Sequence, residues 1–134
     1  MKFVNKYFIA DILSPLQGLG DSNDESLPYY HINPGKKEQV VEMLANLVRP
    51  DFLNKTELIK KKSKLALSYY LTTDKLDFQS FYNSYLYTHP PPLNAKDYYI
   101  WLWEVLFGNE SYILGDADEY VEKNDPNEVL NSYF

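Results

Sequence analysis

Carboxylates and aromatic rings are concentrated in the last 38 residues of this chain. These are the residue types that could bind a metal ion or a partner. Residues 97–134 hold nine acidic side chains against one lysine, a local charge of −8, whereas the whole chain has a net charge of −6. Trp101, Trp103, Tyr112 and Tyr120 lie in the same stretch. Carboxylates at this density can ligate a divalent cation or attract a basic protein, and they repel nucleic acid and anionic membranes.

Tyr and Trp are the side chains that most often anchor protein interfaces, so we expect a partner-binding surface here. Its predicted residues are Asp116, Asp118, Glu119, Glu122, Tyr112, Tyr120 and Trp103. A solvated helix face is the alternative interpretation of the acids, and Trp103, within an apolar helix, could instead belong to the core.

A metal site is the other chemistry that these acids could support, since Asp118 and Glu122 would lie one turn apart on a helix. A calcium loop, however, needs alternating Asp or Asn ligands and a central glycine. Tyr120 and Val121 occupy positions that should hold a ligand and a turn. The sequence therefore predicts no metal site.

Catalytic and cofactor motifs are missing from the sequence. The two histidines, His31 and His89, have no serine nucleophile motif near them, and the chain has no cysteine. Gly18-Leu19-Gly20 lacks the further glycine and the lysine of a phosphate-binding loop. We expect a protein without catalytic residues or cofactors, which is not an enzyme.

The lysines at positions 60, 61, 62 and 64 suggest nucleic-acid binding, but a pI near 4.8 opposes it. We interpret them as the polar side of a helix, where they hold the acidic C-terminal region or keep the protein soluble. The longest apolar block, 98–107, is about half of the roughly twenty residues that a membrane span needs. The sequence thus predicts neither nucleic acid nor membrane as a partner, and a cytoplasmic location.

Periodic apolar residues and capping signals predict the elements that would position this surface. The expected helices are 3–13, 36–48, 55–72, 76–88, 97–107 and 126–132, with Phe3–Val4 also able to form a strand. The predicted N-caps are Asn54, Asp74 or Asp77, Asn94, and Asp125 followed by Pro126, while Gly108 ends the helix before it.

These elements predict an all-α fold: residues 1–134 form a single compact domain of about six helices. Apolar residues occur on every face of 97–107, so this helix should lie at the centre. Six of the thirteen tyrosines fall mostly on predicted buried stripes and should pack in the core: Tyr69, Tyr70, Tyr82, Tyr85, Tyr98 and Tyr99. A Pro/Gly-rich loop occupies residues 14–35.

The stretch 98–112, YYIWLWEVLFGNESY, resembles the helical immunity proteins of bacterial contact-dependent growth inhibition systems. The resemblance lies in general character: a small, acidic, cysteine-free helical protein rich in Tyr and Trp. It implies an inhibitor that binds the C-terminal toxin domain of a cognate effector, commonly a basic nuclease, inside the producing cell. It assigns no role to any individual residue.

Two other functions are compatible with the composition. An acidic nucleic-acid mimic or regulatory adaptor would occupy a DNA-binding protein, and it would need carboxylates in two phosphate-like rows over much of its surface. An enzyme with a carboxylate-based metal site around 116–122 is the third hypothesis.

Overall fold

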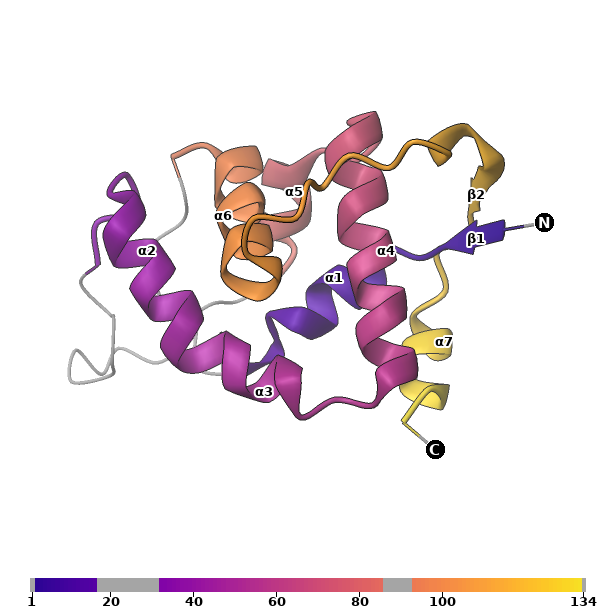
Figure 1. The fold of residues 1–134 in the computed structure, drawn as a ribbon, viewed down its shortest axis with the longest axis horizontal. Coiled ribbons are helices and arrows are strands. Elements are labelled where there is room, and N and C mark those ends of the chain that lie inside the picture. Colours follow the sequence, from indigo (N-terminus) through magenta and orange to yellow (C-terminus); the bar gives the residue numbers. More distant parts are fainter. Residues whose placement is uncertain (1, 17–31, 86–92, 134) are drawn as a thin grey trace.

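The computed structural model describes residues 2–16, 32–85 and 93–133 of the chain (Figure 1). The elements in chain order are β1 (Lys2–Val4), α1 (Tyr7–Ile12), a 3-10 turn (Ser14–Leu16), α2 (Lys37–Met43), a π-helical stretch (Leu44–Val48), α3 (Arg49–Leu53), α4 (Glu57–Thr73), α5 (Phe78–Asn83), α6 (Ala95–Phe107), a second 3-10 turn (Ala117–Glu119), β2 (Tyr120–Glu122) and α7 (Pro126–Asn131).

The residues that the structure describes are mostly helical, at 65%, which confirms the predicted fold class. In the described ranges, α2, the π-helical stretch and α3 follow one another without a break, so the helices form six bodies. The predicted end of the second helix near residue 48 was wrong, because the chain stays helical through Pro50. Proline lacks the N–H that would continue the α-helical ladder, and the wider π turns precede it.

The first predicted helix begins later than expected, because residues 2–4 form a strand. β1 pairs in parallel with β2, in the register Lys2↔Tyr120, Phe3↔Val121 and Val4↔Glu122. The Asn5 side chain accepts a hydrogen bond from the Tyr7 N–H at 3.0 Å, and α1 then runs over Tyr7–Ile12. This sheet is the main departure from the predicted all-helical chain.

Several predicted caps are confirmed. The side chains of Asp77, Asn94 and Asp125 accept N–H hydrogen bonds at the starts of α5, α6 and α7. Gly108 ends α6 at a φ of +62°, a conformation that glycine adopts without strain. The prediction that Asn54 is the N-cap of α4 was wrong. Thr56 caps this helix, and its hydroxyl oxygen accepts a hydrogen bond from the Ile59 N–H.

Two predictions about the start and the length of α5 differ from the structure. Asp74 lies just after α4 with a left-handed φ of 55° rather than starting α5. Of the predicted helix 76–88, α5 covers 78–83, while residues 86–88 lie outside the described ranges, as do 17–31 of the predicted loop.

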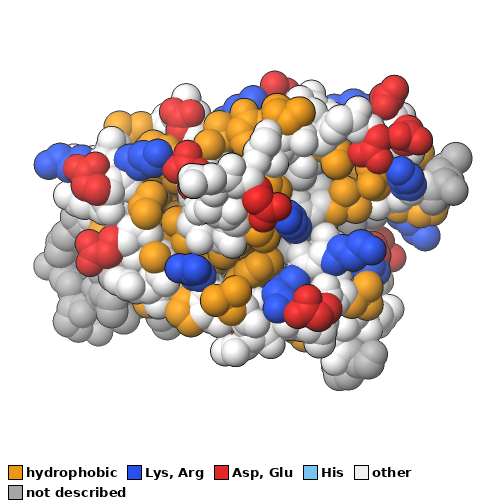
Figure 2. All heavy atoms as spheres, viewed as in Figure 1, with side chains coloured by type: hydrophobic (Ala, Val, Ile, Leu, Met, Phe, Trp, Pro, Cys, Tyr) orange, Lys and Arg blue, Asp and Glu red, His pale blue; other side chains and the backbone are white. Residues whose placement is uncertain are grey.

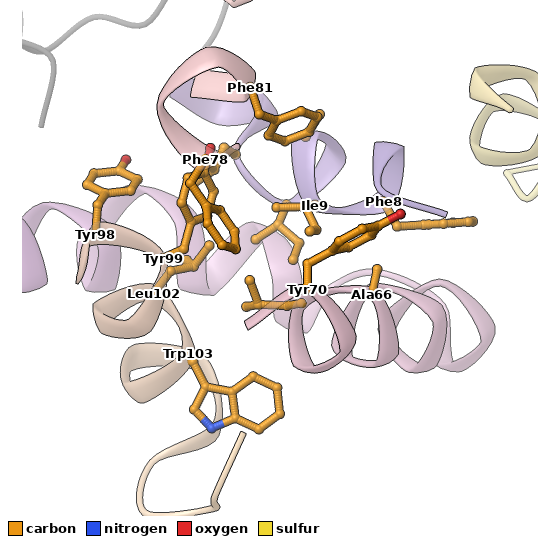
Figure 3. Close-up of a cluster of buried hydrophobic side chains, with 14 of the residues drawn as sticks. Phe8, Ile9, Ala66, Tyr70, Phe78, Phe81, Tyr98, Tyr99, Leu102 and Trp103 are labelled. Atoms are coloured by element: carbon orange, nitrogen blue, oxygen red, sulfur yellow. The ribbon is translucent and has the colours of Figure 1, made fainter. Parts of the chain in front are cut away.

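The core forms where α6 and α4 meet the other helices. α6 packs against α2, α4 and α5, and α4 packs against α1. Figure 3 shows aromatic rings of α5 and α6 next to side chains of α1 and α4. Of the six tyrosines predicted to pack in the core, Tyr85 is only partly buried, and five are buried: Tyr69, Tyr70, Tyr82, Tyr98 and Tyr99.

We expect Leu102→Ala to lower the free energy of unfolding by about 2–5 kcal/mol, because Leu102 is fully buried and its loss leaves a cavity. Leu58→Ala is the matched control, since Leu58 is 52% exposed. Urea unfolding followed by circular dichroism measures both. Equal losses in the two variants would contradict a central position for α6.

Candidate functional site

The acidic C-terminal segment, residues 108–133, is fastened to α4 by hydroxyl groups. Ser68 Oγ and Thr72 Oγ1 both donate to the Tyr112 carbonyl, at 2.6 and 3.2 Å. The Leu114 N–H donates in turn to Thr72 Oγ1 at 3.0 Å. Figure 1 shows this segment crossing α4 on its way from α6 to β2. These hydrogen bonds fix where the segment lies before it reaches the predicted binding residues.

Lysines of α4 pair with acids of the same segment. Lys64 Nζ lies 2.9 Å from Glu110 Oε1, and Lys62 Nζ lies 2.8 Å from Glu128 Oε2. The expectation that this lysine run holds the acidic region is therefore confirmed for Lys62 and Lys64. Part of the acidity that is prominent in the sequence is neutralised within the chain.

Glu128 also ties the N-terminus to α7. The buried Asn5 side chain donates through Nδ2 to Glu128 Oε1 at 3.0 Å and to the Asp125 carbonyl at 2.7 Å. Burial raises the pKa of the Glu128 carboxyl, but the hydrogen bonds from Lys62 and Asn5 outweigh it and hold that pKa below its ordinary value. Glu128 is thus a structural acid in its ionised form.

Asp116, one of the predicted binding residues, pairs with Lys2 across the start of the sheet. Lys2 Nζ lies 2.9 Å from Asp116 Oδ2, and this hydrogen bond lowers the pKa of the Asp116 carboxyl. Both side chains are exposed, so solvent weakens the attraction and the pair adds little stability. The charge of Asp116 is nevertheless compensated.

Glu122, the last predicted acid, accepts a hydrogen bond from a buried tyrosine. The Tyr70 hydroxyl donates to Glu122 Oε1 at 2.7 Å and lies 3.2 Å from Asn124 Oδ1. Burial, and then the hydrogen bond to the Glu122 carboxylate, raise the pKa of the Tyr70 hydroxyl. Tyr70 therefore stays protonated and holds the Glu122 carboxylate in place.

Asp118 and Glu119 are the exposed acids of the predicted site whose side chains make no hydrogen bond or salt bridge in the described part of the chain, although the Glu119 charge attracts Lys2 electrostatically. They belong to a 3-10 turn, and Glu122 to a strand. The predicted helical face with Asp118 and Glu122 one turn apart is thus wrong. Residues 116–122 contain no glycine or proline that would have predicted a 3-10 turn and a strand in place of a helix. The strand forms because it pairs with β1.

Trp103 lies in the core and not on a surface. Trp103 is only 3% exposed, and its Nε1–H donates to the Glu110 carbonyl at 2.6 Å. The indole packs on Phe107, with ring centroids 4.4 Å apart, and Figure 3 shows it at the edge of the buried cluster. Trp103 therefore holds the turn after α6, in place of the interface role predicted for it.

Tyr112 and Tyr120 are half-buried. Both pack against the core, and the Tyr120 ring makes an edge contact with Tyr69, at 6.3 Å between centroids. Lys2 Nζ lies 5.2 Å from the centre of the Tyr120 ring. These tyrosines support the segment, and only part of each ring faces solvent.

Sequence reasoning missed two features of this surface. Val121 is 43% exposed, and its partner in the sheet, Phe3, is 49% exposed, so an apolar pair lies beside the unpaired acids. An apolar groove of about 290 Å³ runs between α4 and the C-terminal segment, lined by Leu65, Trp103, Leu114 and Tyr120 among others. Both features depend on how the segment folds back, which no local pattern encodes.

Residues 118–122 combine the two predicted acids that lack a side-chain partner with the exposed Val121. We call this the acidic strand site: Asp118, Glu119, Tyr120, Val121 and Glu122. Within the described ranges, no three His, Cys, Asp or Glu side chains are grouped so that they could hold a metal ion. None of the helices described is long and apolar enough to span a membrane.

Comparisons with protein-family models, curated proteins and solved structures give no match to this chain.

Glu128→Gln should destabilise the protein by about 1 kcal/mol at pH 7, a modest value because the carboxylate is partly solvated. The folded-state pKa is depressed, so this stabilisation is complete above the ordinary glutamate pKa of about 4.3 and is lost as the pH falls further. Urea unfolding of both proteins between pH 7 and 3 measures the difference.

Glu57→Gln is the control for this prediction, because Glu57 also pairs with a lysine but its side chain is 91% exposed. It should change the stability little at any pH. A Glu128→Gln effect that stays constant below pH 4 would contradict the assigned role of the carboxylate.

Proposed function

We propose that this chain is an immunity protein, which binds and neutralises the C-terminal toxin domain of a bacterial growth-inhibition effector in the cytoplasm of the producing cell. The observation that carries the proposal is the acidic strand site. The Asp118 and Glu119 side chains are exposed and form no salt bridge among the described residues, next to the apolar pair Phe3 and Val121, whereas the neighbouring acids Asp116, Glu110 and Glu128 each form one.

A basic nuclease suits this site electrostatically. An enzyme that binds phosphates presents a cationic cleft, and carboxylates with no partner of their own are free to occupy it. Long-range attraction speeds the encounter, and the adjoining apolar surface slows dissociation. Fast association serves a protein that must neutralise its toxin before the toxin acts.

A nucleic-acid mimic is supported less well by the distribution of charge. Glu104, Glu110, Asp116 and Glu128 each have a lysine partner, so positive and negative groups alternate over the surface. Figure 2 shows Lys/Arg and Asp/Glu side chains interspersed over the face in view. Two phosphate-like rows would require uncompensated acids along the same paths.

A carboxylate-metal enzyme also receives less support. Of the four acids that would be its ligands, Asp116 is bound by Lys2 and Glu122 by the Tyr70 hydroxyl. A metal ion would have to displace both partners. Isothermal titration with Mg²⁺, Mn²⁺ and Ca²⁺ should accordingly show no stoichiometric binding.

The double variant Asp118→Lys with Glu119→Lys tests the proposed function. Asp116 and Glu122 are left intact, because changing them would also break contacts with Lys2 and Tyr70. The probe is a candidate toxin domain, to be sought as the C-terminal domain of any large exported protein encoded next to this chain's gene. We expect co-expression of the unaltered chain to restore growth, and the variant to associate at least about tenfold more slowly at low salt.

Glu38→Lys with Glu42→Lys is the matched control, since both residues are exposed on α2 and the change in net charge is the same. Its association should slow much less. The difference between the association rates of the two double variants should shrink at high salt, where charges are screened within a few ångströms. Equal slowing in both variants, or no protection from the toxin domain, would contradict the proposal.

A further inference from the structure

We infer that the outer edge of β2 receives an extended basic segment of the partner as a third strand of the sheet. This inference rests on the proposed function for the basic character of the partner. It goes beyond that function because it assigns the contact to the backbone of Tyr120 and Glu122, and not only to side-chain charge.

The register of the sheet determines which backbone groups face outward. The Lys123 N–H donates to the Val4 carbonyl at 2.8 Å. Because groups alternate along a parallel ladder, the N–H and C=O of Val121 then point toward β1, and those of Tyr120 and Glu122 point away from it. The Tyr120 N–H closes the preceding 3-10 turn onto the Ala117 carbonyl.

Three outward groups are left: the Tyr120 carbonyl and both the N–H and the carbonyl of Glu122. Among the residues that the structure describes, none of these groups has a hydrogen-bond partner. Glu122 alone offers the donor and acceptor pair that one residue of an added strand would satisfy.

This edge strand is short, at three residues, but it lacks two of the devices by which proteins protect an open strand, a proline and a lysine. Figure 1 shows the two strands together at one end of the molecule, beyond α4. The exposed pair Phe3 and Val121 lies on one face of the sheet, where an apolar side chain of a third strand would continue the contact.

Charge selects the occupant of the edge. Asp118 and Glu119 immediately precede β2, and Glu122 ends it. If β2 of a second copy paired here, these acids would face their own equivalents, and like charges opposite one another destabilise a sheet. A segment with alternating basic and apolar residues would instead pair its cations with the acids.

The test compares Glu122→Pro with Glu122→Ala. Both variants lose the carboxylate and its hydrogen bond to Tyr70, but only proline removes the outward N–H. The probe is a heptapeptide of alternating lysine and valine, titrated into isotope-labelled protein and followed by the amide resonances of Val121 and Lys123. We expect binding to Glu122→Pro to be at least about tenfold weaker than to Glu122→Ala, as loss of one backbone hydrogen bond implies.

Hydrogen exchange provides a second measurement that does not depend on the folding of the proline variant. Saturating peptide should protect the Glu122 amide of the unaltered protein, and a peptide of alternating glutamate and valine should not. Equal peptide affinity for the two variants, or no protection of the Glu122 amide, would overturn the inference.

Parallel titrations with the toxin domain separate this inference from the proposed function. If that domain binds Glu122→Pro and Glu122→Ala equally but loses affinity on charge reversal at Asp118 and Glu119, the strand inference fails and the proposed function stands. If the toxin domain does not bind at all while the basic peptide protects Glu122, the proposed function fails and the edge still accepts a basic strand.

Discussion

Attachment of the C-terminal segment to α4 is the constraint on which the rest of this structure depends. The hydroxyls of Ser68 and Thr72 take up the backbone of residues 112–114, and lysines on the same helix bind Glu110 and Glu128. One side of α4 therefore packs against the core, while its polar side chains bind the C-terminal segment and determine its path. That path brings β2 beside β1, where Lys2 pairs with Asp116 and the Lys123 N–H donates to the Val4 carbonyl.

The same attachment changes what the acidic composition means. A charge of −8 over the last 38 residues suggests a broad anionic surface. Several of these carboxylates, however, bind lysines or hydroxyls of the same chain. Glu128 joins α4, α7 and the N-terminal Asn5, and Glu122 accepts from a buried tyrosine. Next to the sheet, the acids without a salt bridge among the described residues are Asp118 and Glu119. A carboxylate contributes to attraction at long range only where no neighbouring cation cancels its field.

The parts of the fold that could be predicted from sequence are those encoded locally. Apolar periodicity and N-caps such as Asn94 and Asp125 identified α6 and α7 because helix signals act within a few residues. Pairing of residues 2–4 with 120–122 joins the two ends of the chain, and only an ambiguous Phe3–Val4 hinted at it. Which acids of the C-terminal segment have partners depends on Lys2, Lys62, Lys64 and Tyr70, all distant in sequence, so no local pattern could predict it.

Native-state hydrogen exchange on the double variant Ser68→Ala with Thr72→Val tests the central claim most directly. Both changes preserve size while removing the hydroxyls that hold Tyr112 and Leu114. The account predicts much faster exchange at the amides of Leu114 and Lys123, with α6 still protected, since the segment is released while the core remains. Unchanged exchange at Leu114 and Lys123 would contradict it, because the segment and the sheet would then be held by contacts other than these two hydroxyls.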